Sequence, residues 1–236
     1  MSTLRLFPLN TVLFPGATLD LHVFEPRYRR LVEECREDGQ AFGVCLIREG
    51  DEAGDPEVMP CEIGTTAEIA EMRPIEGGRY YLKTIGGRRF QIERVVSRDH
   101  YITAEVAYLD ESPGDEEYAQ EVVGKMHNLF GQYVALIAAF SGAEADVDLP
   151  DDPIDASYIV AQFLQVADSM KQHLLEAPSP ELRLNIELEL LRRLIPRLRA
   201  LGRRKRAAPA AEPADAKDAP FRTRQEQYFG RHFSLN

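Results

Sequence analysis

The sequence from Leu6 to Val32, LFPLNTVLFPGATLDLHVFEPRYRRLV, decides the fold of the first half of the chain. The pair Pro15-Gly16 predicts a turn, because proline presets φ and glycine permits a positive φ. Apolar and polar residues then alternate over 19–23, the period of a half-buried strand. Pro26 suits the first position of a helix, and Gly39 suits its end. The stretch therefore predicts strand, turn, strand and helix.

Further strands are expected after this helix. A continuous apolar run over 41–47 is typical of a strand buried on both faces, and alternation continues over 63–69 and 102–108. Between them, residues 80–85 and 89–96 are expected to form two strands joined by a tight turn at the glycine pair 86–87. About seven short strands with one early helix favour a closed or nearly closed antiparallel barrel, although periodicity alone also allows a sandwich.

The period becomes helical after residue 114. Apolar residues repeat every three or four positions over 115–140, and Asp115 begins this run at the dipole end that favours carboxylates. Asp152 and Ser179 each precede a proline, as helix caps do. The sequence therefore predicts three or four amphipathic helices joined by short loops, which together form a bundle.

Several motifs follow one another along the chain: FPLNTVLFPG and LDLHVFEPRYRRLVEE, then EIGTTAEIAEM, GGRYYLKTIGGRRFQIERV and YITAEVAYLDE, and finally DSMKQHLLEAPSPELRLNIELELLRRL. In this order they resemble the N-terminal substrate-recognition domain of the Lon ATP-dependent proteases. The resemblance spans roughly Leu4 to Leu201. It implies a PUA-like pseudo-barrel followed by helices, in a domain that also occurs alone in bacteria.

The expected fold class is thus α+β. An antiparallel β pseudo-barrel with one early helix is expected over residues 1–111, and a helical bundle over 112–202. An Ala/Pro-rich flexible linker should follow over 203–220, and an aromatic, basic tail over 221–236.

Charge is distributed unevenly along the chain. The formal net charge of −11 disfavours a general nucleic-acid binder. Residues 203–236 hold 8 Lys and Arg against 4 Asp and Glu, and the remaining residues hold 20 against 35. A basic tail on an acidic body suggests docking of the tail on the body or on a partner, with self-association as one form. Plain disorder of the tail is the alternative.

Composition also bears on the compartment. Three cysteines without a C-x-x-C pair fit a reducing compartment, and no apolar stretch approaches the length that spans a bilayer. We therefore expect a cytoplasmic protein that does not contact membranes.

No catalytic motif is recognised in the sequence. The phosphate-binding pattern G-x-x-x-x-G-K-[ST] and the nucleophile elbow G-x-S-x-G are both missing, and the five histidines lack zinc-site spacing. The acidic stretch 49–60 lacks the calcium-loop pattern. We therefore expect no enzyme activity, no metal and no cofactor.

Candidate binding residues follow from three places: the proline corners, the arginines directly after the glycine pair 86–87, and the tail. The arginines could contact RNA, or could be exposed on a hairpin beside an inward Phe90; the corner could be a recognition surface or simple packing. The leading hypothesis is a non-catalytic module that binds unfolded or apolar polypeptide segments or a partner protein. The alternative is an RNA-binding PUA-like protein that uses the barrel and the basic tail. The candidate residues are Phe14, Pro15, Phe24, Pro26, Arg27, Tyr28, Arg88, Arg89, Tyr228, Phe229 and Phe233.

Overall fold

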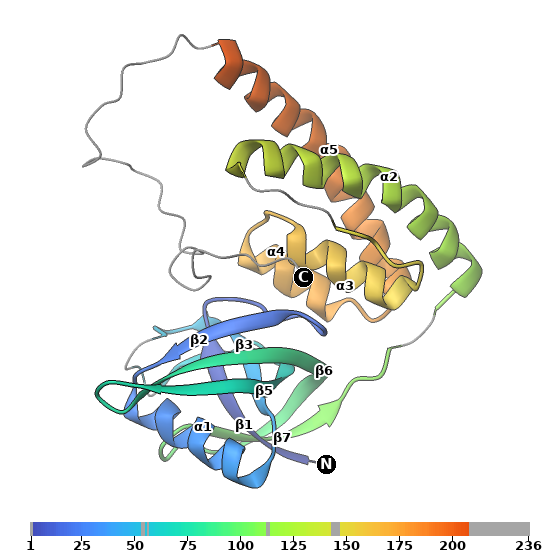
Figure 1. Ribbon diagram of the computed structural model, residues 1–236. Helices are drawn as coiled ribbons and strands as arrows, with labels where there is room; N and C mark the ends of the chain where they lie inside the picture. The colour runs from blue at the N-terminus through green and yellow to red at the C-terminus, as the bar shows by residue number, and fades with distance from the viewer. Residues whose placement is uncertain (1, 53–54, 56, 112–113, 143–146, 208–236) are drawn as a thin grey trace. The chain divides into compact units, whose positions relative to one another are not determined.

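The computed structural model describes residues 2–52, 55, 57–111, 114–142 and 147–207 (Figure 1). The chain forms two compact units. Unit 1 comprises Met1–Ser112 and Leu164–Ser179, and unit 2 comprises Pro113–Phe163 and Pro180–Asn236. The sequence-based division placed 164–179 in the helical bundle, whereas the structure groups this segment with the strands.

Unit 1 is built on a ring of strands (Figure 1). Hydrogen-bonded neighbours follow the order β1-β7-β6-β5-β3, and a parallel pairing of β1 with β3 closes the ring. The expected α+β fold with a barrel-like ring of strands is confirmed; the parallel pair was not foreseen. The strands are β1 (Ser2–Leu9), β2 (Thr18–Val23), β3 (Phe42–Glu49), β4 (Met59–Pro60), β5 (Ile63–Ile75), β6 (Arg79–Ser97) and β7 (Ile102–Tyr108).

The early helix, α1 (Pro26–Asp38), begins and ends where the sequence predicted. Pro26 occupies the first turn, and Gly39 ends the helix with φ 64°. The ring of Tyr28 stacks on Phe7 of β1 with centroids 3.9 Å apart, so the helix is fixed to the sheet by its buried face. The core inside the ring gathers Leu4, Leu6, Cys45, Val58, Phe90, Ile102, Ala104 and Val106.

The predicted turn at Gly86-Gly87 is wrong, because β6 runs through both glycines without a positive φ. Instead, because both residues lack a side chain, neighbouring atoms can approach their backbone closely. A Cβ at Gly86 would lie 2.1 Å from the carbonyl oxygen of Phe14, and one at Gly87 would lie 2.6 Å from Thr66 Oγ1. The backbone of Gly86 also accepts from Gly16 N–H and donates to Ala17 O, each at 2.8 Å. Because Gly86 has no side chain, residues 14–17 can pass directly against β6 before β2 begins.

The segment 164–179, with α4 (Asp168–Glu176), is tied to the strands by Arg89. This side chain is only 3% exposed. It donates to the carbonyl oxygens of Leu175 and Ala177 at 2.7 and 2.8 Å, and it pairs with Glu111 at 2.7 Å. A buried guanidinium with these three acceptors acts as a clamp.

Unit 2 contains the helices α2 (Glu116–Ser141), α3 (Pro153–Phe163) and α5 (Pro180–Ala207). The predicted cap Asp152 is present and accepts from Asp155 N–H. Asp115, predicted to begin α2, also caps it by accepting from Tyr118 N–H. Helix α5 runs to Ala207, so residues 203–207 are helical and lie outside any linker. None of the described helices has the length and apolar character needed to cross a membrane.

Unit 2 also buries the side chains of one arginine and one glutamate on α5. Arg183 and Glu187 are both 0% exposed. Arg183 donates to Ser157 Oγ at 2.7 Å and lies 4.0 Å over the ring of Tyr158. Neither carboxyl oxygen of Glu187 has a hydrogen-bond partner. Burial therefore raises the pKa of Glu187 well above its ordinary value, and Arg183 opposes this rise only in part.

The close approach at Gly86 predicts the cost of adding a methyl group there. Gly86→Ala should lower the free energy of unfolding by about 3 kcal/mol, because its Cβ meets backbone that cannot move away independently. Urea unfolding followed by circular dichroism measures this. Gly124→Ala is the control: nothing lies within 4 Å of its Cβ in the middle of α2, so it should stabilise by up to about 1 kcal/mol. Equal effects of the two substitutions would contradict this account.

The buried carboxyl predicts a pH dependence of stability. A folded-state pKa above 4.5 means that the unfolded state loses its proton first, so the wild type loses stability as pH rises above 4.5, until the folded pKa is passed. The loss has a slope of up to about 1.4 kcal/mol per pH unit. Glu187→Gln cannot ionise, so its stability should increase relative to the wild type over this window.

Chemical denaturation at a series of pH values tests this prediction. Glu189→Gln is the control, since Glu189 is exposed and pairs with Arg192 at 2.8 Å. Parallel pH profiles for wild type and Glu187→Gln would show that Glu187 ionises normally in the folded protein.

Candidate functional site

Unit 1 presents an aromatic surface on two adjacent strands. His22 and Tyr81 are paired across β2 and β6, and their rings stack with centroids 5.1 Å apart. Phe24 follows β2, with its ring 5.7 Å from that of His22. Phe24 and Tyr81 are 53% and 55% exposed. We call His22, Phe24 and Tyr81 the β2–β6 face.

The period of the strands explains this surface. Leu19, Leu21 and Val23 of β2 point into the core, so the intervening side chains of Asp20 and His22 point outward. In a sheet that packs one face on a core, the outward positions are normally polar. Exposed aromatic rings at such positions are characteristic of interaction surfaces.

The same strand has an open edge. Among the described strands, β2 is hydrogen-bonded to β6 alone, with Thr18 opposite Ile85 and Val23 opposite Tyr80. Its other edge therefore has backbone N–H and C=O groups that can pair with an added strand. An open edge beside exposed rings offers both main-chain and side-chain contacts to an extended peptide.

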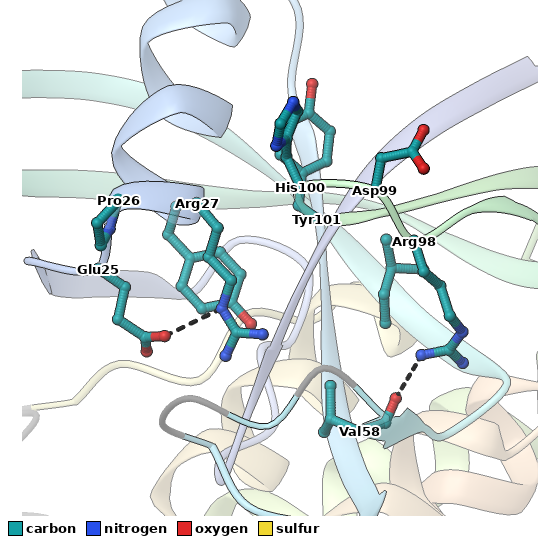
Figure 2. A pocket seen from close by; sticks show the side chains of 10 residues that line it. Glu25, Pro26, Arg27, Val58, Arg98, Asp99, His100 and Tyr101 are labelled. Carbon is teal, nitrogen blue, oxygen red and sulfur yellow. Dashed lines mark hydrogen bonds and ion pairs between the residues drawn. The ribbon is translucent and has the colours of Figure 1, made fainter.

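A pocket lies at the start of α1, next along the chain from Phe24 (Figure 2). Its volume is about 350 Å³. Tyr28, Val58 and Ile102 contribute buried apolar surface, and Arg27 and Arg98 come from opposite sides. The lining residues are Glu25, Pro26, Arg27, Tyr28, Val58, Arg98, Asp99, His100, Tyr101 and Ile102.

The polar groups of the pocket are held by local contacts. Arg27 pairs with Glu25 at 3.0 Å and donates to the carbonyl oxygens of Asp55 and Glu52 at 2.9 and 3.3 Å. Arg98 donates to the carbonyl oxygen of Val58 at 3.0 Å, as Figure 2 shows. The guanidinium groups are thus fixed in place before any ligand binds.

Two pKa shifts reflect these contacts. Burial raises the pKa of the Tyr28 hydroxyl to about 12, so this ring stays neutral at physiological pH. Backbone N–H groups of Glu57 and Asp51 donate to the Asp55 carboxylate and lower its pKa, which stabilises the acidic loop beside Arg27. The pocket therefore combines an apolar interior with charges that are already paired.

Several predicted site residues come together here. Pro26, Arg27 and Tyr28 line the pocket, and Phe24 belongs to the β2–β6 face. Phe14 instead is 2% exposed and packs in the interior. Pro15 is half-buried in the turn before β2.

The two arginines after the glycine pair are already engaged. Arg88 pairs with exposed Asp110 at 3.0 Å and lies 4.5 Å over the ring of Tyr108, while Arg89 is the buried clamp. The expectation that both arginines are exposed is therefore wrong for Arg89, whereas the inward Phe90 is confirmed. The remaining candidates, Tyr228, Phe229 and Phe233, lie outside the described residues.

Two residues of the β2–β6 face, His22 and Tyr81, were not among the candidates predicted from the sequence. His22 could have been found, because alternation places it on the same side of β2 as Asp20. Tyr81 could not, because its position beside His22 depends on the register between strands that are far apart in the sequence.

Within the described residues, no group of three or more His, Cys, Asp or Glu side chains could hold a metal ion. Burial raises the pKa of the Cys35 thiol to about 11 and also raises that of Cys45. Both therefore remain thiols at neutral pH and behave as apolar side chains.

Comparison with known proteins places this geometry in a family. The profile of the ATP-dependent protease La (LON) substrate-binding domain matches residues 3–193. The Lon protease of Anaeromyxobacter dehalogenans is 26% identical over 195 residues, which cover 81% of this chain and 23% of that protein. The Lon protease of Flavobacterium johnsoniae is 32% identical over 116 residues, or 48% of this chain and 14% of that protein. The chain thus spans less than a quarter of the length of these relatives.

Solved structures support the same family. The crystal structure of a Lon N-terminal domain protein from Xanthomonas campestris has a TM-score of 0.58 and 29% identity, and covers 80% of this chain and 98% of that one. The N-terminal domain of the Mycobacterium avium complex Lon protease shares the fold, with a TM-score of 0.64 at 17% identity and the same coverage. With the profile match over most of its length, the chain belongs to the LON substrate-binding domain family.

Proposed function

We propose that this protein is a non-catalytic module that binds extended, apolar segments of unfolded polypeptide at the open edge of β2 and on the β2–β6 face. The observation that carries the proposal is the position of two half-exposed aromatic rings, Phe24 and Tyr81, at a strand that pairs with one neighbour among the strands the structure describes. The family to which the chain belongs is described as substrate-binding, which supports a polypeptide ligand.

The physical basis is strand addition. Main-chain hydrogen bonds to the β2 edge would give affinity that does not depend on the peptide sequence. The rings of His22, Phe24 and Tyr81 would select segments with apolar side chains at alternate positions. Such a site binds many unfolded chains weakly, and it excludes folded proteins whose strands are already paired.

The pocket would extend this site. Phe24 directly precedes the lining residues Glu25 and Pro26, and we propose that a side chain of the bound segment enters the pocket beyond Phe24. Its buried apolar wall of Tyr28, Val58 and Ile102 suits an apolar side chain. We assign the pocket to this role.

The non-catalytic part of the proposal is supported by the comparisons. The match covers the substrate-binding domain, and the matching relatives align with this chain over less than a quarter of their length. We accordingly propose that the module acts by holding polypeptide, in the cytoplasm, without hydrolysing it.

Replacing the aromatic rings tests the proposal. Phe24→Ser and Tyr81→Thr should each weaken binding of a fluorescently labelled, reduced and alkylated polypeptide by roughly tenfold, because exposed rings at the centre of an interface carry much of its energy. Fluorescence anisotropy measures the dissociation constant.

The matched control is Val96→Ser, which removes an exposed apolar side chain from the same strand as Tyr81 but away from the β2–β6 face. It should leave the dissociation constant unchanged. Binding that survives both aromatic substitutions, or that falls equally with Val96→Ser, would refute this assignment.

A further inference from the structure

We propose that the β2–β6 face selects extended polypeptide segments in which a lysine or arginine lies between two apolar residues at alternate positions, and that Asp20 pairs with the basic residue. The inference rests on the proposed function and deepens it, because it names the class of segment that pairs with the β2 edge. Its basis is the pattern of charge that β2, β6 and β5 display on their exposed side.

The exposed side chains of these three neighbouring strands form rows across the sheet. Asp20 of β2 is opposite Lys83 of β6, and Lys83 is opposite Glu71 of β5. All three residues are exposed. In the next row, His22 is opposite Tyr81. Side chains in directly opposite positions lie about 5 Å apart and interact, so a strand added beside β2 would extend each row by one residue.

Asp20 is the charge that such a strand would meet first. Because strands lie about 4.8 Å apart, one ligand side chain would lie about 5 Å from Asp20 and about 10 Å from Lys83. The larger distance is about one Debye length at 0.1 M ionic strength, so salt screens the lysine more strongly than the aspartate. Asp20 forms no ion pair with another residue that the structure describes, so its carboxylate can pair with the ligand. A cation opposite Asp20 is therefore favoured.

The neighbouring rows specify the residues on either side of the basic one. Alternate side chains of a strand point to the same face, so the ligand residues two positions away lie opposite Thr18 and His22. Thr18 is small and is paired with Ile85, which is 42% exposed, and the ring of His22 stacks on Tyr81. Both rows thus present apolar surface, and they favour apolar or aromatic ligand side chains.

The selected pattern does not depend on the direction of the ligand strand. A basic residue with an apolar residue two positions away on each side reads the same in a parallel and in an antiparallel pairing. An acidic residue at the centre would face Asp20, and like charges in directly opposite positions destabilise a ladder. The formal net charge of −11 adds a general attraction for basic segments, which the experiment has to separate from the pairing at Asp20.

Three synthetic peptides of symmetric sequence test the selection. They are Ser-Phe-Thr-Arg-Thr-Phe-Ser and the same peptide with glutamine or glutamate at its centre, each with blocked ends and the same fluorescent label. Fluorescence anisotropy with the full chain measures the dissociation constants at about 0.15 M salt. The wild type should bind the arginine peptide about fivefold more tightly than the glutamine peptide, and the glutamate peptide about fivefold more weakly than the glutamine peptide.

Substitutions of Asp20 show whether this residue makes the selection. Asp20→Arg should reverse the order of the three peptides, because the charge opposite the central residue changes sign. Asp20→Asn, which keeps the shape of the side chain, should bring the three dissociation constants within about twofold of one another.

The matched control is Glu93→Arg. It makes the same change in net charge at an exposed residue of β6, beyond the part of this strand that pairs with β2. It should leave the order of the peptides and the spacing of their affinities unchanged. Equal losses of affinity for the arginine peptide in Glu93→Arg and Asp20→Arg would show that the acidic body alone attracts it, and would overturn the assignment of Asp20.

Phe24→Ser separates this inference from the proposed function. If it weakens binding of all three peptides while the wild type binds them equally, the selection is refuted and the binding surface stands. If neither Phe24→Ser nor Asp20→Arg changes any affinity, the peptides bind elsewhere, and both proposals are refuted. If Asp20→Arg reverses the order while Phe24→Ser has no effect, selection by Asp20 stands and the role given to the Phe24 ring is refuted.

Discussion

The contact between Phe14 and Gly86 is the constraint on which unit 1 depends. The carbonyl oxygen of Phe14 lies so close to Gly86 that only glycine fits there. Because the chain crosses at this point, β6 can pair with β2 along its first half and with β7 along its second, while β5 follows its other edge. The ring continues through β7 and β1 to β3, and among the described strands β2 is left as an extra strand paired on one edge alone. The surface that we assign to polypeptide binding is therefore a by-product of how the barrel is closed.

Local features of the fold were predictable because their causes are local. Pro26 and Gly39 set the ends of α1, Asp115 sets the start of α2, and alternation marked β2. Gly86 was misread because a glycine pair that permits a turn looks the same in sequence as one that makes room for another strand. The parallel pairing of β1 with β3 depends on partners far apart in the chain, which periodicity does not specify.

The candidate site, like the fold, was predictable from sequence where its causes are local. The proline corner gave Phe24, Pro26, Arg27 and Tyr28, which the structure places on the face or in the pocket. Arg88 and Arg89 looked equivalent in sequence, yet one is exposed and the other is buried against the segment 164–179. Only the covering of β6 by a segment that is distant in the chain distinguishes them.

The position of the segment 164–179 in unit 1 affects how this domain can be transferred between genes. The chain passes between the two units at residues 112–113, 163–164 and 179–180, so neither unit is encoded by one continuous stretch of gene. A recombination event that transferred codons 1–112 alone would deliver a ring of strands in which Arg89 keeps its ion pair with Glu111 but has lost both carbonyl acceptors and the segment that covers it. Because the backbone passes back and forth between the two units, gene fusion and shuffling are expected to transfer both units together.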